Sequence, residues 1–405
     1  MHARLLPPSA GLQACITECR VLPLARERGG RGGGGAAAPA APDAAPAAAP
    51  PSPAVAASPM GPPSAAAASA AAAAMSGARL EEPPPPSPER RFVPVAAPGG
   101  AEITGAAVSL RAVSLNLAGD ASRWPRLRPR LEAHGADVLL LQGLGGEHFG
   151  RDVAPWLSAS GYGFAFGPSG APSDAGCALA WRTAALDARE AAAPRLRDAV
   201  ALIAAGEGGE AARALWQQLA AREEGCAFAL LRHRASGVRL LAASALLASD
   251  AALPDVAAAQ AHVQCALLAA ALQRHGHAPS DVGLVPLLLG GGFEASSRTP
   301  EGGLSGPLAL LAQGEVGPGH PAHPAAWRQQ PELRGLRLGA AGLRLESVYP
   351  LDAAAVSGDA LWFASRAATL IERLEATAGG AAPAAGAHPA LGCALIARGD
   401  VEWSG

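Results

Sequence analysis

The stretch Val108–Gly146 decides the fold class, because it predicts a strand, a helix and a second strand in that order. Val108–Asp120, VSLRAVSLNLAGD, is an apolar run ending in a polar turn, which is typical of a buried strand. Arg123–Gly135, RWPRLRPRLEAHG, has the spacing of an amphipathic helix closed by glycine, although Pro129 lies inside it. Ala136–Gly146, ADVLLLQGLGG, predicts the second strand and its turn.

Strands alternate with helices along the rest of the chain as well. Asp255–His275, DVAAAQAHVQCALLAAALQRH, has the most regular helical spacing, and Ser305–Val316 predicts a short helix. The further predicted strands are GCALAWR (176–182), GCAFALLRHR (225–234), VRLLAASALLAS (238–249), VGLVPLLL (282–289), LRLESVYP (343–350), DALWFAS (359–365) and GCALIARGDVEW (392–403). This order favours a layered α/β or α+β core over a helix bundle.

The 405 residues divide into a low-complexity arm and one ordered domain. Residues 1–88 are dominated by Ala, Pro, Gly and Ser and have too few apolar side chains for a core, so we predict disorder there and a domain over 89–405. The Arg-bearing, acid-poor N-terminus also resembles a transit peptide. We expect a cytoplasmic protein, or a mitochondrial or plastid one if that segment is a transit peptide. No apolar run of membrane-spanning length is evident, so no membrane partner is expected.

Charge and cysteine content narrow the classes of partner. The net charge is −2 and no lysine occurs, so the chain lacks the overall positive field typical of nucleic-acid-binding proteins. A local arginine groove stays open as an alternative. One predicted helix carries four arginines: Arg123, Arg126, Arg128 and Arg130. We interpret them either as part of such a groove or as a solvated helix face. The six scattered cysteines predict neither a disulfide framework nor a metal site.

The glycine run in Leu287–Ser297, LLLGGGFEASS, raises the question of a phosphate-binding loop. Consecutive glycine N–H groups can hold anions. A Walker loop also needs a lysine, and the chain has none, while the Gly-x-Gly-x-x-Gly dinucleotide pattern is absent here too. We therefore predict an ordinary strand-to-loop turn and no nucleotide cofactor. His320 and His323, in GHPAHP, predict an extended surface loop in preference to a metal site.

About ten segments, in the same order, resemble motifs of the endonuclease/exonuclease/phosphatase superfamily. SLNLAGD resembles its Ser-Tyr-Asn-Ile-Leu-Ala opening, ADVLLLQGLGGEHF its Ala-Asp-Ile-x-x-Leu-Gln-Glu-Val-x-x-x-His-Phe motif, and SDAGCALAWR its Asp-Gly-Cys-Ala strand. LLAASALLAS takes the place of the Asn-Thr-His strand, LLLGGGFEASS of Gly-Asp-Phe-Asn-Ser, and GDALWFA of Leu-Asp-Tyr-Ile-Phe-Tyr. SGPLALLAQGEVGPGHPA is similar to the following segment in carbon catabolite repressor type deadenylases, whose relatives include nocturnin, angel and 2′,5′-phosphodiesterase.

This resemblance implies a two-layer β-sandwich flanked by helices, of the α/β class. For intact members it also implies Mg²⁺-dependent phosphodiester cleavage, typically trimming poly(A) from the 3′ end of RNA. Such chemistry needs carboxylates that hold Mg²⁺, a group that activates water and a donor for the developing charge.

Several of the family's site residues are replaced in this sequence. Asn116 and Asp359 match retained polar positions beside the metal. The resemblance places the principal glutamate ligand at Gly143, the phosphate-stabilising histidine at Ala245 and an aspartate ligand at Gly292. None of these three replacements carries a side-chain oxygen or nitrogen.

Three further residues bear on any remaining activity. Glu294 stands in the place of the family's asparagine and would add a carboxylate, and Glu147 would replace the lost glutamate only if its loop were shifted. The terminal Asp-His pair falls either on Leu391-Gly392 or on Ala387-His388, and the aspartate is absent in both registers.

We therefore expect a deadenylase-like pseudo-nuclease with an RNA- or protein-binding role. The remnants of its catalytic site would be Asn116, Asp359 and His388. The alternative is a working Mg²⁺-dependent exoribonuclease with a rearranged site, in which Glu294 and Asp359 bind the metal. A third possibility is a scaffold or relaxed gene copy. Loss of one catalytic group typically lowers the rate by about 10²–10⁴-fold, so several losses leave little activity of this class.

Overall fold

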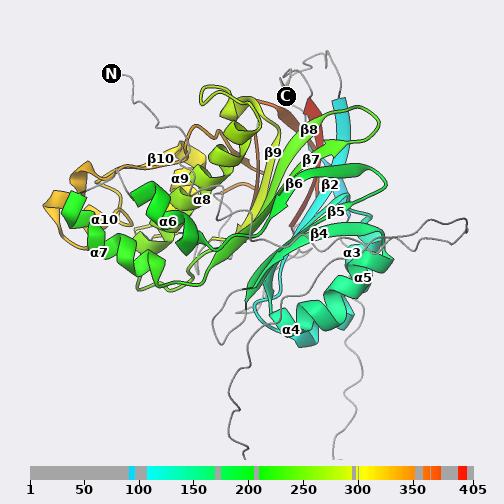
Figure 1. Cartoon of the computed structure of the whole chain (residues 1–405), viewed down its shortest axis with the longest axis horizontal. Helices are drawn as coiled ribbons and strands as arrows, with labels where there is room; N and C mark the ends of the chain where they lie inside the picture. Colours follow the sequence, from blue (N-terminus) through cyan, green and yellow to red (C-terminus); the bar gives the residue numbers. More distant parts are fainter. Residues whose placement is uncertain are drawn as a thin grey trace, which may run out of the picture. The chain divides into compact units, whose positions relative to one another are not determined.

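In the computed structural model, the residues described are 91–95, 107–168, 175–204, 209–293, 298–299, 301–351, 359–364, 366–374 and 391–398. They form two mixed β-sheets packed face to face, with helices on the outer sides of both (Figure 1). The arm predicted over 1–88, Glu294 and His388 lie outside the described residues.

The first sheet is built around the strand-helix-strand unit predicted for Val108–Gly146. Two parallel strands, β2 and β3, are joined by α3 (Trp124–His134), which contains Pro129 and ends at Gly135 with φ 58°. In spatial order the seven strands are β1 (Phe92–Pro94), β14 (Ala368–Leu374), β15 (Leu391–Arg398), β2 (Ala107–Asn116), β3 (Val138–Leu144), β5 (Gly176–Arg182) and β4 (Tyr162–Gly167). The prediction for this unit is confirmed.

The second sheet repeats this arrangement with a longer helix. Parallel strands β8 and β9 are joined by α8 (Pro254–Arg274), close to the predicted helix Asp255–His275. In spatial order the six strands are β12 (Glu346–Ser347), β13 (Asp359–Phe363), β9 (Leu287–Gly292), β8 (Arg239–Leu246), β7 (Gly225–His233) and β6 (Leu186–Ala192). A separate two-stranded sheet pairs β10 (Glu315–Val316) with β11 (Leu338–Gly339).

Helices cover the outer face of each sheet. Those on the first sheet are η1 (Ala121–Arg123), α3, α4 (Gly146–His148), η2 (Phe149–Val153) and α5 (Ala154–Ala159). Those on the second sheet are α6 (Leu196–Ala204), α7 (Gly209–Ala220), α8, η3 (Val282–Leu284), α9 (Gly306–Gln313), α10 (Pro324–Trp327) and η4 (Pro331–Gly335).

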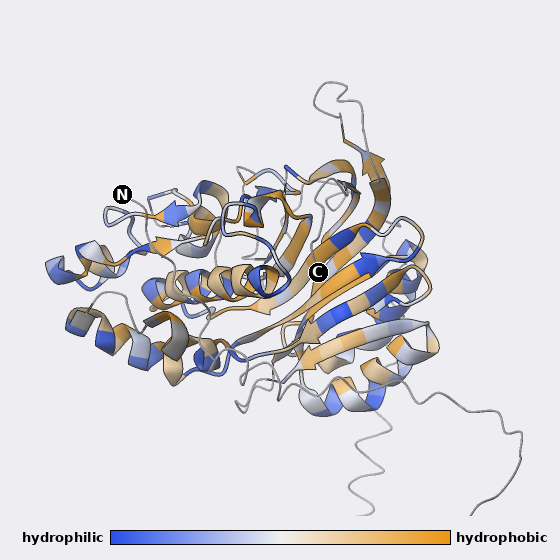
Figure 2. Cartoon of the chain, turned by 45° about the horizontal axis from the view of Figure 1, so that its top comes forward, coloured by the Kyte–Doolittle hydropathy of each residue, from blue (hydrophilic) through white to orange (hydrophobic). Residues whose placement is uncertain are grey.

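Three apolar layers result from this arrangement. One lies between the sheets, one between the second sheet and its helices, and one between the first sheet and its helices. Because successive strand residues point to opposite faces, a central strand buries side chains in two of these layers. Figure 2 shows the strands of the sandwich as mainly hydrophobic for this reason.

The described structure differs from the sequence prediction at several elements. Residues Val282–Leu284 form a 3₁₀ turn, and the strand begins after Pro286. The glycines of Leu287–Ser297 are not a turn, because Gly290, Gly291 and Gly292 are strand residues of β9. Among the elements that were not predicted, four lie in Ala-rich or charged segments, whose periodicity is weak: β6, α6, α7 and β14.

Helix α8 is the central element of the second helical layer. Among the described residues, it is a helix long and apolar enough to cross a membrane, whereas the sequence predicted no run of that length. Most of its length is buried in the domain, including the polar Asp255, Gln260 and Gln264. It therefore serves here as a core helix.

Candidate functional site

The candidate site lies at the end of the sandwich where the parallel strands of both sheets terminate. Asn116 is the last residue of β2 in the first sheet, and Asp359 is the first residue of β13 in the second. The Asn116 Nδ2 donates a hydrogen bond to Asp359 Oδ1 at 2.9 Å. Both residues are only 6% exposed. Asn116 and Asp359, the two predicted site residues that the structure describes, are thus brought together, and they join the two sheets.

The Asn116 side chain is fixed by its own turn. Its Oδ1 accepts a hydrogen bond from the backbone N–H of Ala118 at 2.8 Å, an Asx-type turn. The guanidinium of Arg123 donates to the carbonyl oxygens of Asn116 and Leu117 at 3.4 and 3.3 Å. The amide therefore has one orientation, with its oxygen toward the turn and its nitrogen toward Asp359.

Gly143 occupies a bulge of β3 directly beside Asn116. Its φ is +67°, and the register of β3 against β5 shifts between Gln142 and Leu144. A Cβ at position 143 would lie 2.6 Å from the backbone nitrogen of Ala118 and 2.7 Å from Asn116 Oδ1. The backbone cannot yield as a flexible side chain can, so the structure has no room for a carboxylate at this position.

Gly292 faces the same polar pair from β9. A Cβ there would lie 2.9 Å from Asn116 Nδ2 and 3.2 Å from Asp359 Oδ1. It would also lie 3.1 Å from Leu246 Cδ1, so Leu246 is the β8 residue beside the pair. Ala245 belongs instead to the helix-side core. Strand alternation explains this difference, because positions 245 and 246 must face opposite sides of the sheet.

A second set of polar side chains crosses between the sheets below this pair. Gln142 Nε2 donates to Ser244 Oγ at 2.9 Å, and Ser244 Oγ donates to the carbonyl of Leu141 at 3.1 Å. Ser114 lies within 3.3 Å of Gln142 and faces Gly290, where a Cβ would meet Ser114 Oγ at 2.7 Å. Glycine at 290 and 292 thus lets the sheets approach closely enough for these hydrogen bonds, which explains two of the three glycines in the run.

The side chains that the structure describes at this site do not fit a magnesium ion. Magnesium keeps several waters and is reluctant to lose them, so it needs open space as well as carboxylates. Within the described ranges, no three His, Cys, Asp or Glu side chains are grouped to hold a metal ion. Asp359 is buried and engaged by Asn116, while positions 143 and 292 offer no ligand atoms. Glu294 lies outside the described residues.

Two other candidate residues, Glu147 and His323, have partners within the domain. Glu147 lies on α4 with a side chain 88% exposed and pairs with Arg151 at 3.3 Å, so it does not replace the missing carboxylate. The prediction that His323 lies in an exposed loop is wrong, because it is fully buried. Its Nδ1 accepts from the N–H of Ala325, and its Nε2 bonds the carbonyl of Leu336. Its burial lowers the pKa of His323.

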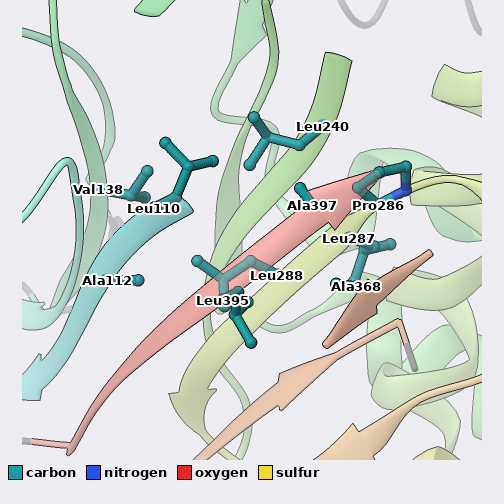
Figure 3. Close-up of a pocket in the computed structure, with 10 residues that line it drawn as sticks. All are labelled: Leu110, Ala112, Val138, Leu240, Pro286, Leu287, Leu288, Ala368, Leu395 and Ala397. Atoms are coloured by element: carbon teal, nitrogen blue, oxygen red, sulfur yellow. The ribbon is translucent and has the colours of Figure 1, made fainter. Parts of the chain in front are cut away.

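A cavity between the sheets is separate from this polar site. It is lined by apolar side chains of β2, β3, β8, β9, β14 and β15 and by Pro286, as Figure 3 shows. Its volume is about 20 Å³, which is enough for about one water molecule. It cannot accommodate a nucleotide.

Two sheets with paired strand-helix-strand units and flanking helices define the endonuclease/exonuclease/phosphatase fold, which this chain has. No protein-family model matches the sequence, and no curated protein sequence matches it.

Similarity to the solved structure of ANGEL2 supports the fold assignment. The structure of ANGEL2, a 2′,3′-cyclic phosphatase, in complex with adenosine-2′,3′-vanadate, superposes with a TM-score of 0.52 and 15% identity, covering 76% of this chain and 98% of that one. The human nocturnin catalytic domain with bound sulfate gives a TM-score of 0.48 and 16% identity, covering 76% and 97%.

Proposed function

We propose that this protein is a deadenylase-like pseudo-nuclease, which binds RNA or a protein partner without hydrolysing phosphodiesters by a metal-dependent route. The supporting observation is the hydrogen bond between Asn116 and Asp359, with Gly143 and Gly292 packed against it. Asn116 and Asp359, which would face a metal ion in an active site of this kind, form a hydrogen bond with each other instead. The adenosine-2′,3′-vanadate bound to ANGEL2 makes RNA the first ligand to test.

The test measures hydrolysis and binding on the full-length protein. We expect no release of AMP from oligo(A), and no opening of a 2′,3′-cyclic phosphate end, above the level of the Asp359→Ala variant in Mg²⁺ or Mn²⁺. We also expect oligo(A) binding, measured by fluorescence anisotropy, to be the same with EDTA as with Mg²⁺.

One outcome would contradict the proposal, and a second would narrow it to a protein partner. Turnover abolished by both Asp359→Ala and Glu294→Ala would establish the alternative, a working hydrolase with a rearranged site. Absence of RNA binding in both metal conditions would remove the RNA-binding part and leave a protein partner to be sought. Turnover that survives both substitutions would indicate a contaminating nuclease.

A further inference from the structure

The end strands of the two sheets differ in how well they are protected against pairing with another chain. An end strand leaves one row of backbone N–H and C=O groups unpaired, and proteins protect such rows with short strands, proline, charged side chains or bulges. The four end strands that the structure describes are β1 and β4 in the first sheet and β12 and β6 in the second (Figure 1).

Three of these four strands carry such protection. Strand β1 has three residues, of which the last is Pro94, and β12 has only two residues. Strand β6 carries the charged Asp187, Arg189 and Glu190, and its register against β7 shifts between Ala188 and Glu190. Each of these edges is therefore a poor template for a further strand.

Strand β4 has none of these features. Its six residues, YGFAFG, include no charged side chain and no proline, and its register against β5 is continuous from Tyr162 to Gly167. After the buried Tyr162, the residues of the strand are half-buried. Apart from β5, its main contacts are α5 on the outer face and β6 and β7 in the second sheet. An uncharged edge of this length is the kind that pairs with another strand.

The backbone groups that face outward from β4 belong to Tyr162, Phe164 and Phe166. The N–H of Thr183 donates to the carbonyl of Gly161 at 3.0 Å, so position 161 faces β5. Because this direction alternates along an antiparallel strand, the even-numbered residues of β4 face away from β5. Within the described ranges, no hydrogen bond reaches the backbone of these three residues from outside the sheet.

The side chains of β4 suit pairing of the strand with itself. Tyr162, Phe164 and Phe166 lie on the helix-covered face of the first sheet, and Ala165 lies on the face toward the second sheet. A two-fold axis through the sheet at Phe164 would place this residue opposite its own copy and Tyr162 opposite Phe166. Aromatic pairs across antiparallel strands are stabilising, and no like charges would meet in this uncharged strand.

We propose that β4 is a dimerisation edge, at which two copies of this chain pair antiparallel about a two-fold axis at Phe164. Such a contact uses the same surface of both copies and satisfies the same outward-facing backbone groups in each. It joins two seven-stranded sheets into one continuous sheet. The inference does not depend on whether the Asn116–Asp359 site is active.

The experiment compares charge variants at the centre of the proposed contact with matched variants at the other end of the same sheet. In the full-length protein, Phe164→Lys and Phe164→Glu each place like charges directly opposite each other at the axis. Val93→Lys and Val93→Glu change a half-buried apolar residue of β1 in the same way. Sedimentation velocity at a series of protein concentrations measures self-association. Thermal melting checks the fold, because the Phe164 ring also packs against Phe149 at 5.4 Å.

We expect the wild type to dimerise and each Phe164 variant alone to self-associate at least about tenfold more weakly. An equimolar mixture of Phe164→Lys and Phe164→Glu should restore association, because opposite charges then meet at the axis. The Val93 variants should associate like the wild type. Restored association in the mixture cannot arise from misfolding, since it requires both variants to be folded.

A measurement on the wild type alone tests the same contact without any substitution. Hydrogen exchange followed by mass spectrometry should show that protection of the segment Tyr162–Gly167 rises with protein concentration, because the outward-facing N–H groups become paired. A wild type that stays monomeric at every concentration would overturn the proposal. So would Phe164 variants that associate like the wild type, or a mixture that associates no better than either variant alone.

Discussion

Gly143 and Gly135 have the same left-handed backbone but different surroundings. Their φ angles are +67° and +58°, yet a Cβ at 143 would contact Ala118 and Asn116, whereas nothing lies within 4 Å of a Cβ at 135. Gly135→Ala should cost about 1–2 kcal/mol for the left-handed conformation alone. Gly143→Ala should cost roughly a further 1–3 kcal/mol from overpacking. Urea unfolding of both variants measures the difference.

The same contacts bear on attempts to introduce a metal ligand at position 143. Gly143→Glu should destabilise the protein at least as much as Gly143→Ala and should not produce Mg²⁺ binding in calorimetry. Equal costs at positions 143 and 135 would show that the bulge relaxes freely, and Mg²⁺ binding by Gly143→Glu would show that the Asn116 turn opens.

At the scale of elements, α10 depends on a buried histidine for its N-terminal cap. His323 is uncharged when it accepts from the N–H of Ala325, and burial lowers its pKa below the usual 6.5, aided by His320 and opposed by the Leu336 carbonyl. Between that lowered pKa and 6.5 the unfolded chain binds more protons than the folded protein. The free energy of unfolding from this residue is thus highest above pH 6.5 and falls as the pH drops through it.

We expect His323→Asn to reduce the loss of stability between pH 7.5 and 5, because asparagine can cap the helix but does not titrate. The expected contribution is about 1.4 kcal/mol for each unit of pKa shift. Chemical denaturation at several pH values provides the measurement, with His233→Asn as the matched histidine replacement. A pH profile of His323→Asn parallel to that of the wild type would contradict this role.

At the scale of the whole molecule, the hydrogen bond from Asn116 to Asp359 connects two sheets that also meet through the Gln142–Ser244 hydrogen bond and a layer of apolar side chains. A double-mutant cycle with Asn116→Ala and Asp359→Ala should give a coupling free energy of about 0.5–3 kcal/mol, as for residues in direct contact. The free energies of unfolding of the wild type, both single variants and the double variant supply the cycle. Additive effects would mean that this pair does not hold the sheets together.

The sequence by itself determined the units of this fold. The apolar runs of β2, β3 and β8 and the helical spacing of α8 are local patterns, so each unit was predicted close to its observed bounds. Weakly patterned segments such as β6 and α7 escaped prediction because alanine and charged residues fit several structures.

Only the tertiary structure decided what the candidate site contains. Gly143 and Gly292 could be recognised as unusual from sequence, but their close contacts with Asn116 arise from residues far apart in the chain. The side of β8 on which Ala245 lies also depends on strand register. Local periodicity specifies which face of an element is buried, whereas contacts between elements follow from how the sheets pair and pack.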